Sequence, residues 1–282
     1  MNILLVGVNG YLGSELAISL NALSHKVFRG VSKARNPGEI EIPLYGMVDL
    51  SQSDFPDLVI DVSNRYIPNE NPDSLRKMEN SIIGVASTLC NSNEKWKVDI
   101  LQGTSYLQYC SPDKQPWNHY ADIRNTALKL LQDSAVNSKS NLYEFVLHDT
   151  YGEVRRKKFL DLCIQAVSGP KVQAGDGNSV INLTHVRDIS NFISQKVHKA
   201  ELSESEYKRW SIRSDETYNL RELVNLIEEI SGVSGIAEWG SSAQIRRQVV
   251  QLWNIPESNS EFKNTVKLQS WLQNLFSTDF QQ

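Results

Sequence analysis

Short apolar runs alternate with longer amphipathic stretches through the first half of the chain. Runs rich in Val, Ile and Leu occupy residues 3–6, 26–31, 40–44, 58–62, 98–102 and 142–147. Runs of this length are typical of strands buried on both faces of a sheet. Helical spacing of apolar residues occurs at 14–23, 72–90 and 120–132. Strands that alternate with helices predict βαβ units and an α/β fold with a Rossmann-type, doubly wound parallel sheet.

The pattern changes after Tyr151-Gly152. A basic cluster at residues 155–158 opens a part of the chain in which helical spacing dominates, through about 167 and then at 186–198, 220–230, 241–252 and 265–276. We therefore expect a dinucleotide-binding Rossmann domain over residues 1–152, with a returning segment near 180–200. The remainder, residues 153–282, is expected to form a smaller, mostly helical substrate-binding lobe.

Composition limits the kinds of partner. The 282 residues carry 29 Lys and Arg against 33 Asp and Glu, a net charge of −4, and a nucleic-acid binder usually shows a basic excess. The longest apolar run near the start, residues 3–8, is too short to cross a membrane, and no basic segment precedes it to form a secretory signal. The three cysteines show no C-x-x-C spacing, which predicts a reducing compartment without disulfides or a zinc site. We expect a cytoplasmic protein with a small-molecule ligand and no metal.

A glycine-rich loop lies between the first strand and the first helix. Gly7, Gly10 and Gly13 form G-x-x-G-x-x-G, with Tyr11 and Leu12 inside the motif. Glycine allows a pyrophosphate to approach the backbone closely, and the N–H groups at the start of the helix then bind the anion. The alternative is a tight strand–helix turn that binds nothing. The position of the motif favours a dinucleotide cofactor.

The end of the second predicted strand indicates which dinucleotide. An acidic residue about 20 positions after the glycines favours NAD, whereas basic residues accommodate the 2′-phosphate of NADP. Here Ser32, Lys33 and Arg35 occupy this region, and no carboxylate occurs between Glu15 and Glu39. A solvated surface turn would have the same composition. The sequence favours NADP over NAD.

Several motifs occur in an order that resembles a known family. A predicted strand ends at Gln102-Gly103-Thr104-Ser105, and a helix opens 15 positions later with Tyr120-Ala121-Asp122-Ile123-Arg124. The other motifs are Asp49-Leu50, Asn80, Tyr151-Gly152, Gly175-Asp176-Gly177 and His185-Val186-Arg187-Asp188. With the glycine loop, they resemble the extended short-chain dehydrogenase/reductases, the NAD-dependent epimerase/dehydratase family. The nearest resemblance is to the CDP-3,6-dideoxyhexose synthases, which are 4-ketoreductases.

The resemblance implies a catalytic set. Ser105 would hydrogen-bond the reacting oxygen of the substrate, and Tyr120 would act as general acid/base, which requires a tyrosine pKa lowered from about 10. In the family a lysine four residues later lowers that pKa and binds the nicotinamide ribose. Here Arg124 takes that position and role; arginine keeps the charge but has a larger planar head. We expect reduced or altered catalysis. Taken alone, Tyr120 and Arg124 could be an aromatic–cation pair on a helix.

The resemblance also implies binding positions for cofactor and substrate. Asp49, Leu50 and Val62 would lie beside the cofactor, and Ser63, Asn64 and Arg65 would face the cofactor or the substrate. Asp149 stands where the family often has an asparagine that binds the nucleotide diphosphate, and Ile181 stands where it often has an arginine. A carboxylate repels a diphosphate, and the basic run could compensate, although such a run is often only a solvated face. Its residues are Arg155, Arg156, Lys157 and Lys158.

Two hypotheses from different classes follow. The first is an NADP-dependent reductase or epimerase acting on the 4-position of a nucleotide-activated sugar, in the homodimeric form that the resemblance implies. The second is an NADP-binding sensor or regulatory protein with weak or no catalysis, motivated by Arg124, Asp149 and Ile181.

Overall fold

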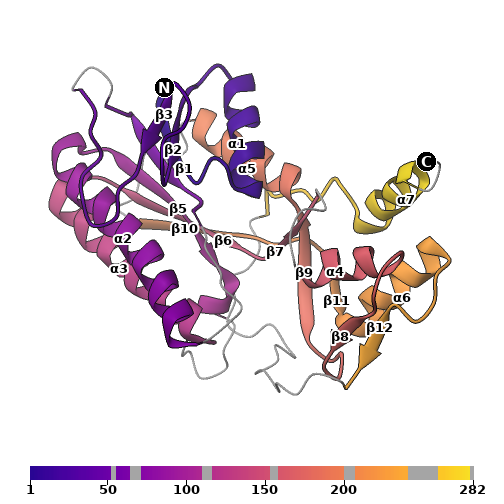
Figure 1. Ribbon diagram of the computed structural model, residues 1–282. Helices are drawn as coiled ribbons and strands as arrows, with labels where there is room; N and C mark the ends of the chain where they lie inside the picture. The colour runs from indigo at the N-terminus through magenta and orange to yellow at the C-terminus, as the bar shows by residue number, and fades with distance from the viewer. Residues whose placement is uncertain are drawn as a thin grey trace.

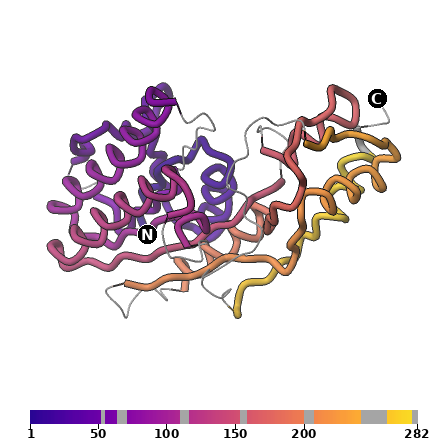
Figure 2. The backbone as a smooth tube through the Cα atoms, turned by 90° about the horizontal axis from the view of Figure 1, so that it is seen from below, coloured from indigo at the N-terminus to yellow at the C-terminus, as the bar shows by residue number. Residues whose placement is uncertain are grey.

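The chain forms two lobes of unequal size (Figures 1 and 2). The computed structural model describes residues 1–51, 55–63, 71–109, 116–152, 158–199, 207–240 and 260–279. Among these residues, no helix is long and apolar enough to cross a membrane.

The larger lobe is built on a parallel sheet of seven strands. Their order is β3-β2-β1-β4-β5-β6-β10, and every neighbouring pair is parallel. The strands are β1 (Asn2–Val6), β2 (Lys26–Val31), β3 (Glu39–Glu41), β4 (Leu58–Asp61), β5 (Asp99–Ser105), β6 (Leu142–Leu147) and β10 (Tyr207–Ile212). This sheet confirms the predicted Rossmann-type α/β fold, and six of its strands are those that the apolar runs predicted.

Helices cover both faces of this sheet (Figure 1). One face packs against α1 (Tyr11–Ala22) and α5 (Val186–His198), and the other packs against α2 (Pro72–Trp96) and α3 (His119–Ser138). Buried Val, Ile and Leu side chains of the strands point alternately to the two layers, so both faces must be covered. Helix α1 begins at Tyr11, directly after the glycine loop, which places that loop at the carboxyl end of β1.

The returning segment extends further than the sequence predicted. Helix α5 lies near the predicted 180–200, and strand β10 follows it and adds the seventh strand beside β6. Trp210 of β10 is buried and stacks on Tyr143 and Phe145, with ring centroids 5.6 and 5.0 Å apart. The first three residues of β10 are exposed, so the apolar pattern of this edge strand is too short to be recognised in the sequence.

Within the described residues, the smaller lobe combines three helices with two short sheets. Its helices are α4 (Phe159–Ala166), α6 (Leu220–Ser231) and α7 (Leu268–Asp279). One sheet has the order β11-β9-β7, with β7 (Asp149–Tyr151), β9 (Val180–His185) and β11 (Thr217–Asn219), and the other pairs β8 (Val172–Ala174) with β12 (Ala237–Trp239). Helices were predicted here and the sheets were not, because most of these strands have three residues, too few to show a period of two. The helix predicted at 241–252 lies outside the described residues.

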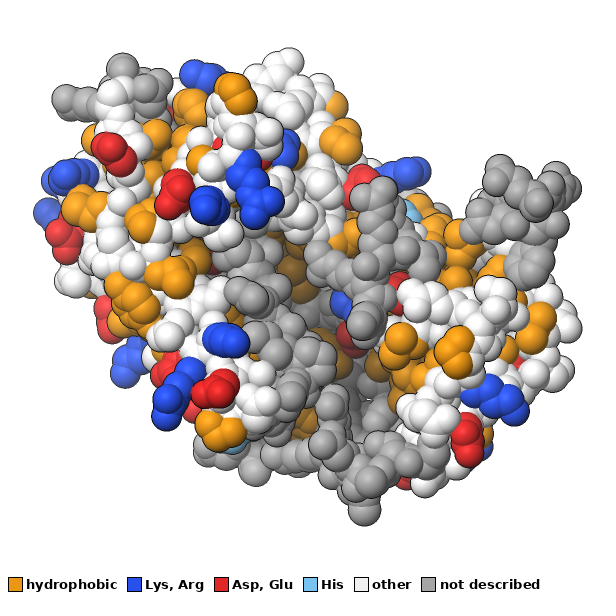
Figure 3. Space-filling view, viewed as in Figure 1, with side chains coloured by type: hydrophobic (Ala, Val, Ile, Leu, Met, Phe, Trp, Pro, Cys, Tyr) orange, Lys and Arg blue, Asp and Glu red, His pale blue; other side chains and the backbone are white. Residues whose placement is uncertain are grey.

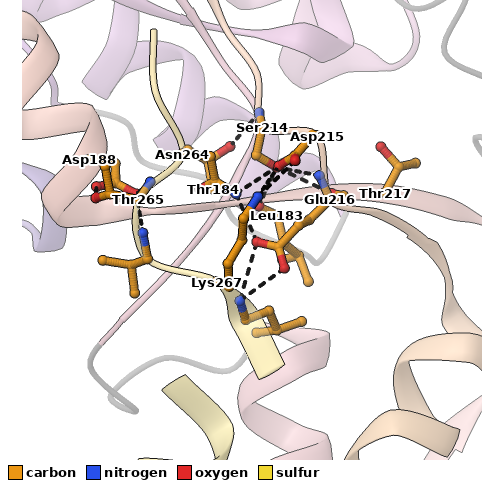
Figure 4. A network of polar contacts seen from close by, with 12 residues as sticks. Leu183, Thr184, Asp188, Ser214, Asp215, Glu216, Thr217, Asn264, Thr265 and Lys267 are labelled. Carbon is orange, nitrogen blue, oxygen red and sulfur yellow. Dashed lines mark hydrogen bonds and ion pairs between the residues drawn. The ribbon is translucent and has the colours of Figure 1, made fainter. Parts of the chain in front are cut away.

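Two carboxylates, the buried Asp188 and the half-buried Glu216, accept hydrogen bonds from the segment that leads into α7 (Figure 4). Asp188 of α5 accepts hydrogen bonds from the backbone N–H groups of Thr265 and Val266, both at 2.9 Å, and from the Thr265 hydroxyl. Glu216 accepts from the backbone N–H of Leu268 at 3.0 Å and from Asn264 at 2.9 Å. We call these contacts of Asp188 and Glu216 the anchoring network. It attaches the segment before α7 to helix α5, which covers the large sheet, and to the residue before β11 of the smaller lobe.

Candidate functional site

A cavity of about 1590 Å³ lies at the carboxyl edge of the large sheet and reaches residues of the smaller lobe. The surface is hollowed between the two lobes (Figure 3). Twelve of the residues predicted from the sequence line this cavity: Gly7, Gly10, Tyr11, Leu12, Ser32, Lys33, Arg35, Val62, Ser63, Ser105, Tyr120 and Asp149. Ligands of doubly wound sheets bind at this edge.

The glycine loop is shaped by close contacts within the protein. Gly7 has φ +86°, and a Cβ on it would lie 2.8 Å from the backbone of Ser63. A Cβ on Gly13 would lie 2.2 Å from the carbonyl oxygen of Gly7, so Gly13 lets α1 pack against the loop and does not itself line the cavity. Gly10 precedes the first turn of α1 and lines the cavity with that turn. The positive end of α1 therefore faces the cavity.

Charges of both signs meet at the end of β2. Lys33 and Arg35 line the cavity, and so do Glu39 and Glu41 of β3. The Glu39 carboxylate accepts from the backbone N–H of Arg35 at 2.8 Å and of Asn36 at 3.1 Å, and these bonds, with that of the Asn36 side chain, lower the pKa of Glu39. Spacing along the chain did not predict that either carboxylate would line the cavity. Parallel pairing sets Glu41 beside Val31, the last residue of β2.

Ser105 and Tyr120, the predicted catalytic pair, line the same cavity. Ser105 ends β5, and its hydroxyl accepts from the backbone N–H of Leu107 at 3.3 Å, which caps the short 3₁₀ helix that follows. Tyr120 is the second residue of α3 and is buried. Asn118 caps that helix by accepting from the backbone N–H of Ala121 at 3.0 Å. The two predicted groups thus come from a strand end and a helix start that meet at the cavity.

A second tyrosine near Ser105 has a different environment. The Tyr109 hydroxyl donates to the fully buried carboxylate of Glu144. Burial and the negative charge of Glu144 raise the pKa of Tyr109 far above its ordinary value, so Tyr109 keeps its proton. Tyr120, which lines the cavity, is the better candidate for proton transfer.

Arg124 lies outside the cavity lining. It is buried one turn after Tyr120 on α3, where its Nη2 donates to the carbonyl oxygen of Gly103 on β5. Its Nε has no hydrogen-bond partner, and within the described residues no carboxylate lies within 4.0 Å of its guanidinium. The shared face of Tyr120 and Arg124 was predicted from their spacing. The direction of the arginine, toward the sheet, was not.

Other predicted residues are not brought to the cavity or are not described. Asp49 is exposed, and Leu50 packs against the core on the α2–α3 face of the sheet; neither lines the cavity. Asn64, Arg65, Arg155 and Arg156 lie outside the described residues.

A polar cluster lines the cavity beyond β6, and the sequence predicted only its Asp149 and Lys158 as possible binding residues. We call Tyr106, His148, Asp149 and Lys158 the cavity cluster. The Tyr106 hydroxyl donates to Asp149 at 3.1 Å, and the rings of Tyr106 and His148 stack at 5.0 Å with an angle of 10° between their planes. Lys158 donates to the backbone oxygen and the hydroxyl of Thr150, at 3.3 and 3.0 Å. Burial raises the pKa of Asp149, and the charge of Lys158 and the Tyr106 bond oppose that rise.

The strand order, the glycine loop after β1 and the cavity at the carboxyl edge together define a Rossmann-type, doubly wound α/β fold with a candidate ligand site. This is the class of fold that the sequence predicted. No protein-family model and no curated protein matches the chain by sequence.

Solved structures match it over their whole length. UDP-glucose 4-epimerase from Thermotoga maritima, with UDP-glucose, is 14% identical at a TM-score of 0.76, covering 100% of each chain. MoeE5 in complex with UDP-glucose and NAD is 18% identical at 0.78, again covering 100% of each chain. UDP-glucuronic acid 4-epimerase from Bacillus cereus, in complex with UDP-glucuronic acid and NAD, is 17% identical at 0.75, covering 98% of each. Such identities establish a shared fold. The narrower resemblance to CDP-3,6-dideoxyhexose synthases is not confirmed.

Proposed function

We propose that this chain is a nicotinamide-dependent enzyme that acts on the 4-position of a nucleotide-activated sugar, as an epimerase or a 4-ketoreductase. The observation that carries the proposal is that Ser105 and Tyr120 line one cavity together with the glycine loop and the start of α1. The neighbours in fold support it, because all three are described with a UDP-sugar and two of them also with NAD.

The residues present fit a dinucleotide. Gly7 and Gly10 allow a close approach to the loop backbone, and the positive end of α1 suits a pyrophosphate. The cavity exceeds the roughly 300–1,000 Å³ of a typical small-molecule pocket, so it has room for a cofactor and a second ligand. When bound, the nicotinamide would supply or accept a hydride.

The chain's own residues would manage the proton and the oxygen. Tyr120 would donate a proton to the 4-oxygen of the sugar during reduction and remove it during oxidation. Ser105 would hydrogen-bond the same oxygen and hold it beside Tyr120. Burial of Tyr120 keeps bulk water from competing for that proton.

NADP is our proposed cofactor. Within the described residues, neither the ammonium of Lys33 nor the guanidinium of Arg35 forms an ion pair, so both are available to a 2′-phosphate. Glu39 and Glu41 line the same end of the cavity, which makes the preference a direct question. We expect calorimetry to show tighter binding of NADPH than of NADH, and Lys33→Met to weaken NADPH roughly tenfold while leaving NADH unchanged. Lys77→Met, at another exposed lysine of the cavity, is the matched control. Equal binding of the two cofactors by the wild type would refute the preference.

The catalytic assignment is tested by removing one oxygen. Tyr120→Phe should lower turnover of UDP- and CDP-hexoses by about 10²–10⁴-fold while NADPH affinity stays within twofold. Tyr109→Phe removes the hydroxyl that is bound to Glu144 and should retain turnover. Unchanged turnover in Tyr120→Phe would remove this tyrosine from the mechanism.

The position of Arg124 favours a second candidate, a cofactor-binding sensor or regulatory protein with little catalysis. Its guanidinium donates a hydrogen bond to Gly103 and lies outside the cavity. The lysine of the family, in contrast, would hold the nicotinamide ribose. Arg124→Lys separates the two candidates. Turnover that appears only in the variant supports the sensor, whereas lower turnover in the variant supports an enzyme that uses arginine. The homodimer stays a prediction, which light scattering would test.

A further inference from the structure

His148 is a buried residue of the cavity. It follows β6, is 5% exposed and lines the cavity. In the part of the chain that the structure describes, neither Nδ1 nor Nε2 of its ring has a hydrogen-bond partner. A buried polar group without a partner is destabilising, so this arrangement reduces the stability of the free protein.

The ring is nevertheless held in one orientation. It stacks on Tyr106, whose hydroxyl donates to Asp149. The Asp149 carboxylate thus holds Tyr106, and the Tyr106 ring holds the imidazole of His148. Such support is what a binding residue needs, because a fixed side chain loses little entropy when a ligand binds.

His148 lies beside the predicted reaction centre. Leu147, the residue before it, is paired in register with Ser105 on the neighbouring strand, and adjacent strands are about 4.8 Å apart. A sugar whose 4-oxygen contacted Ser105 would therefore have other ring substituents within reach of His148. The pyrophosphate-binding glycine loop follows β1, and β4 and β5 separate β1 from β6.

The ring is neutral near pH 7. Burial, and then the charge of Arg213, lower the pKa of His148 to about 3; Asp149 and Lys158 are the other charged groups of the cavity cluster. A neutral imidazole offers one N–H donor and one nitrogen acceptor. That pair matches a hydroxyl group, which donates and accepts, and does not match a phosphate or a carboxylate, which only accept.

We propose that His148 binds a hydroxyl group of the sugar part of the substrate and so contributes to sugar specificity. Asp149 is then a positioning residue that acts through Tyr106, and not a contact to the diphosphate. This inference rests on the proposed function, whose substrate class it sharpens.

Calorimetry on the protein loaded with NADPH tests the inference. The probes are UDP-glucose and CDP-glucose, with UDP and CDP as references that lack the sugar. His148→Phe should weaken the sugar nucleotides about tenfold or more and leave UDP and CDP unchanged. The free variant should also melt about 2–4 °C higher, because the unpartnered nitrogens are gone.

His25→Phe is the matched control. His25 is also buried, and neither of its nitrogens has a hydrogen-bond partner among the described residues, but it packs against His198 and does not line the cavity. It should raise the melting temperature in the same way and leave all four affinities unchanged. If His148→Phe does not fold, His148→Gln, which keeps a donor and an acceptor, should retain more sugar affinity than His148→Leu.

The role of Asp149 is tested by comparing Asp149→Asn with Asp149→Ala. Asp149→Asn keeps an acceptor for the Tyr106 hydroxyl and should retain sugar affinity, whereas Asp149→Ala should weaken the sugar nucleotides and not the free nucleotides. A changed affinity for UDP or CDP in Asp149→Ala would mean that Asp149 faces the diphosphate.

The failures can be told apart. Wild-type protein that binds none of the four nucleotides overturns the proposed function. Sugar nucleotides that bind no tighter than the free nucleotides, or that bind His148→Phe as tightly as wild type, overturn only the role of His148.

Discussion

Two polar clusters of this chain, each buried or half-buried, differ in how completely their groups are bonded. In the anchoring network, both oxygens of Asp188 and both oxygens of Glu216 accept hydrogen bonds from the segment that leads into α7. In the cavity cluster, Tyr106 and Asp149 bond each other, but neither nitrogen of His148 has a hydrogen-bond partner among the residues that the structure describes.

The difference distinguishes polar groups that stabilise the fold from polar groups that are available to a ligand. A bonded buried carboxylate fixes the chain, and removing it leaves donors without partners. An unpartnered ring in a cavity weakens the free protein and becomes useful only when a ligand supplies the missing partners. Substitutions in the two clusters should therefore change stability in opposite directions.

The largest expected effect is in the anchoring network. Asp188→Ala leaves the N–H groups of Thr265 and Val266 and the Thr265 hydroxyl without their acceptor. We expect a loss of about 3 kcal/mol in the free energy of unfolding, measured by urea denaturation. Asp188→Asn, which keeps one acceptor oxygen, should lose less. A loss below about 1 kcal/mol in Asp188→Ala would contradict a supporting role for the network.

The second effect is a dependence on pH. The pKa of His148 is about 3 in the folded chain, against an ordinary value near 6.5. Between these values the unfolded chain binds a proton that the folded chain does not, so stability decreases as pH falls below 6.5. Each such histidine contributes up to about 1.4 kcal/mol per pH unit. Urea denaturation between pH 6 and 4 gives the free energy of unfolding as a function of pH. His148→Phe should depend on pH less steeply than wild type, by the uptake of up to one proton on unfolding. An unchanged slope would show that the ring is protonated in the folded state.

A smaller effect distinguishes two histidines near pH 7.5. His185 caps α5, because its Nδ1 accepts from the backbone N–H of Arg187 at 3.2 Å. His185→Phe should therefore destabilise the protein by about 1 kcal/mol, whereas His148→Phe should stabilise it. Melting temperatures of the two variants in one buffer provide the measurement. Shifts of the same sign would remove the contrast between a bonded and an unpartnered buried histidine.

The smallest effect is at an exposed ion pair beside the anchoring network. Asp215 and Lys267 form an ion pair at 2.6 Å, with side chains 72% and 43% exposed. Exposed pairs contribute little because water and salt screen them. Asp215→Asn should change the free energy of unfolding by about 0.5 kcal/mol or less, and a loss equal to that of Asp188→Ala would mean that burial does not set the strength of this network.

The sequence predicted the large sheet well because its strands carry their own signal. Continuous apolar runs mark strands buried on both faces, and the glycine loop marks the point where β1 turns into α1. Strand β10 was missed because half of it is exposed, and the three-residue strands of the smaller lobe are held by pairing partners distant in the sequence.

The cavity was predicted in part, for a similar reason. Gly7, Gly10, Ser105 and Tyr120 belong to motifs with fixed spacing, and all four line the cavity. Glu41 joins them through the pairing of β2 and β3, which no spacing reveals. The direction of Arg124 and the lack of partners around His148 depend on which neighbours surround each side chain, and those neighbours come from several strands and helices.

The path of the chain between the lobes has a consequence for how this protein can change during evolution. The chain enters the smaller lobe after β6, returns to complete the large sheet with α5 and β10, and leaves again for α6 and α7 (Figure 1). Neither lobe is a continuous stretch of sequence. A new substrate lobe cannot be acquired by one recombination event at a single junction, because the exchanged piece would carry an edge strand of the other lobe with it. Gradual substitution around the cavity is the route that this topology leaves open.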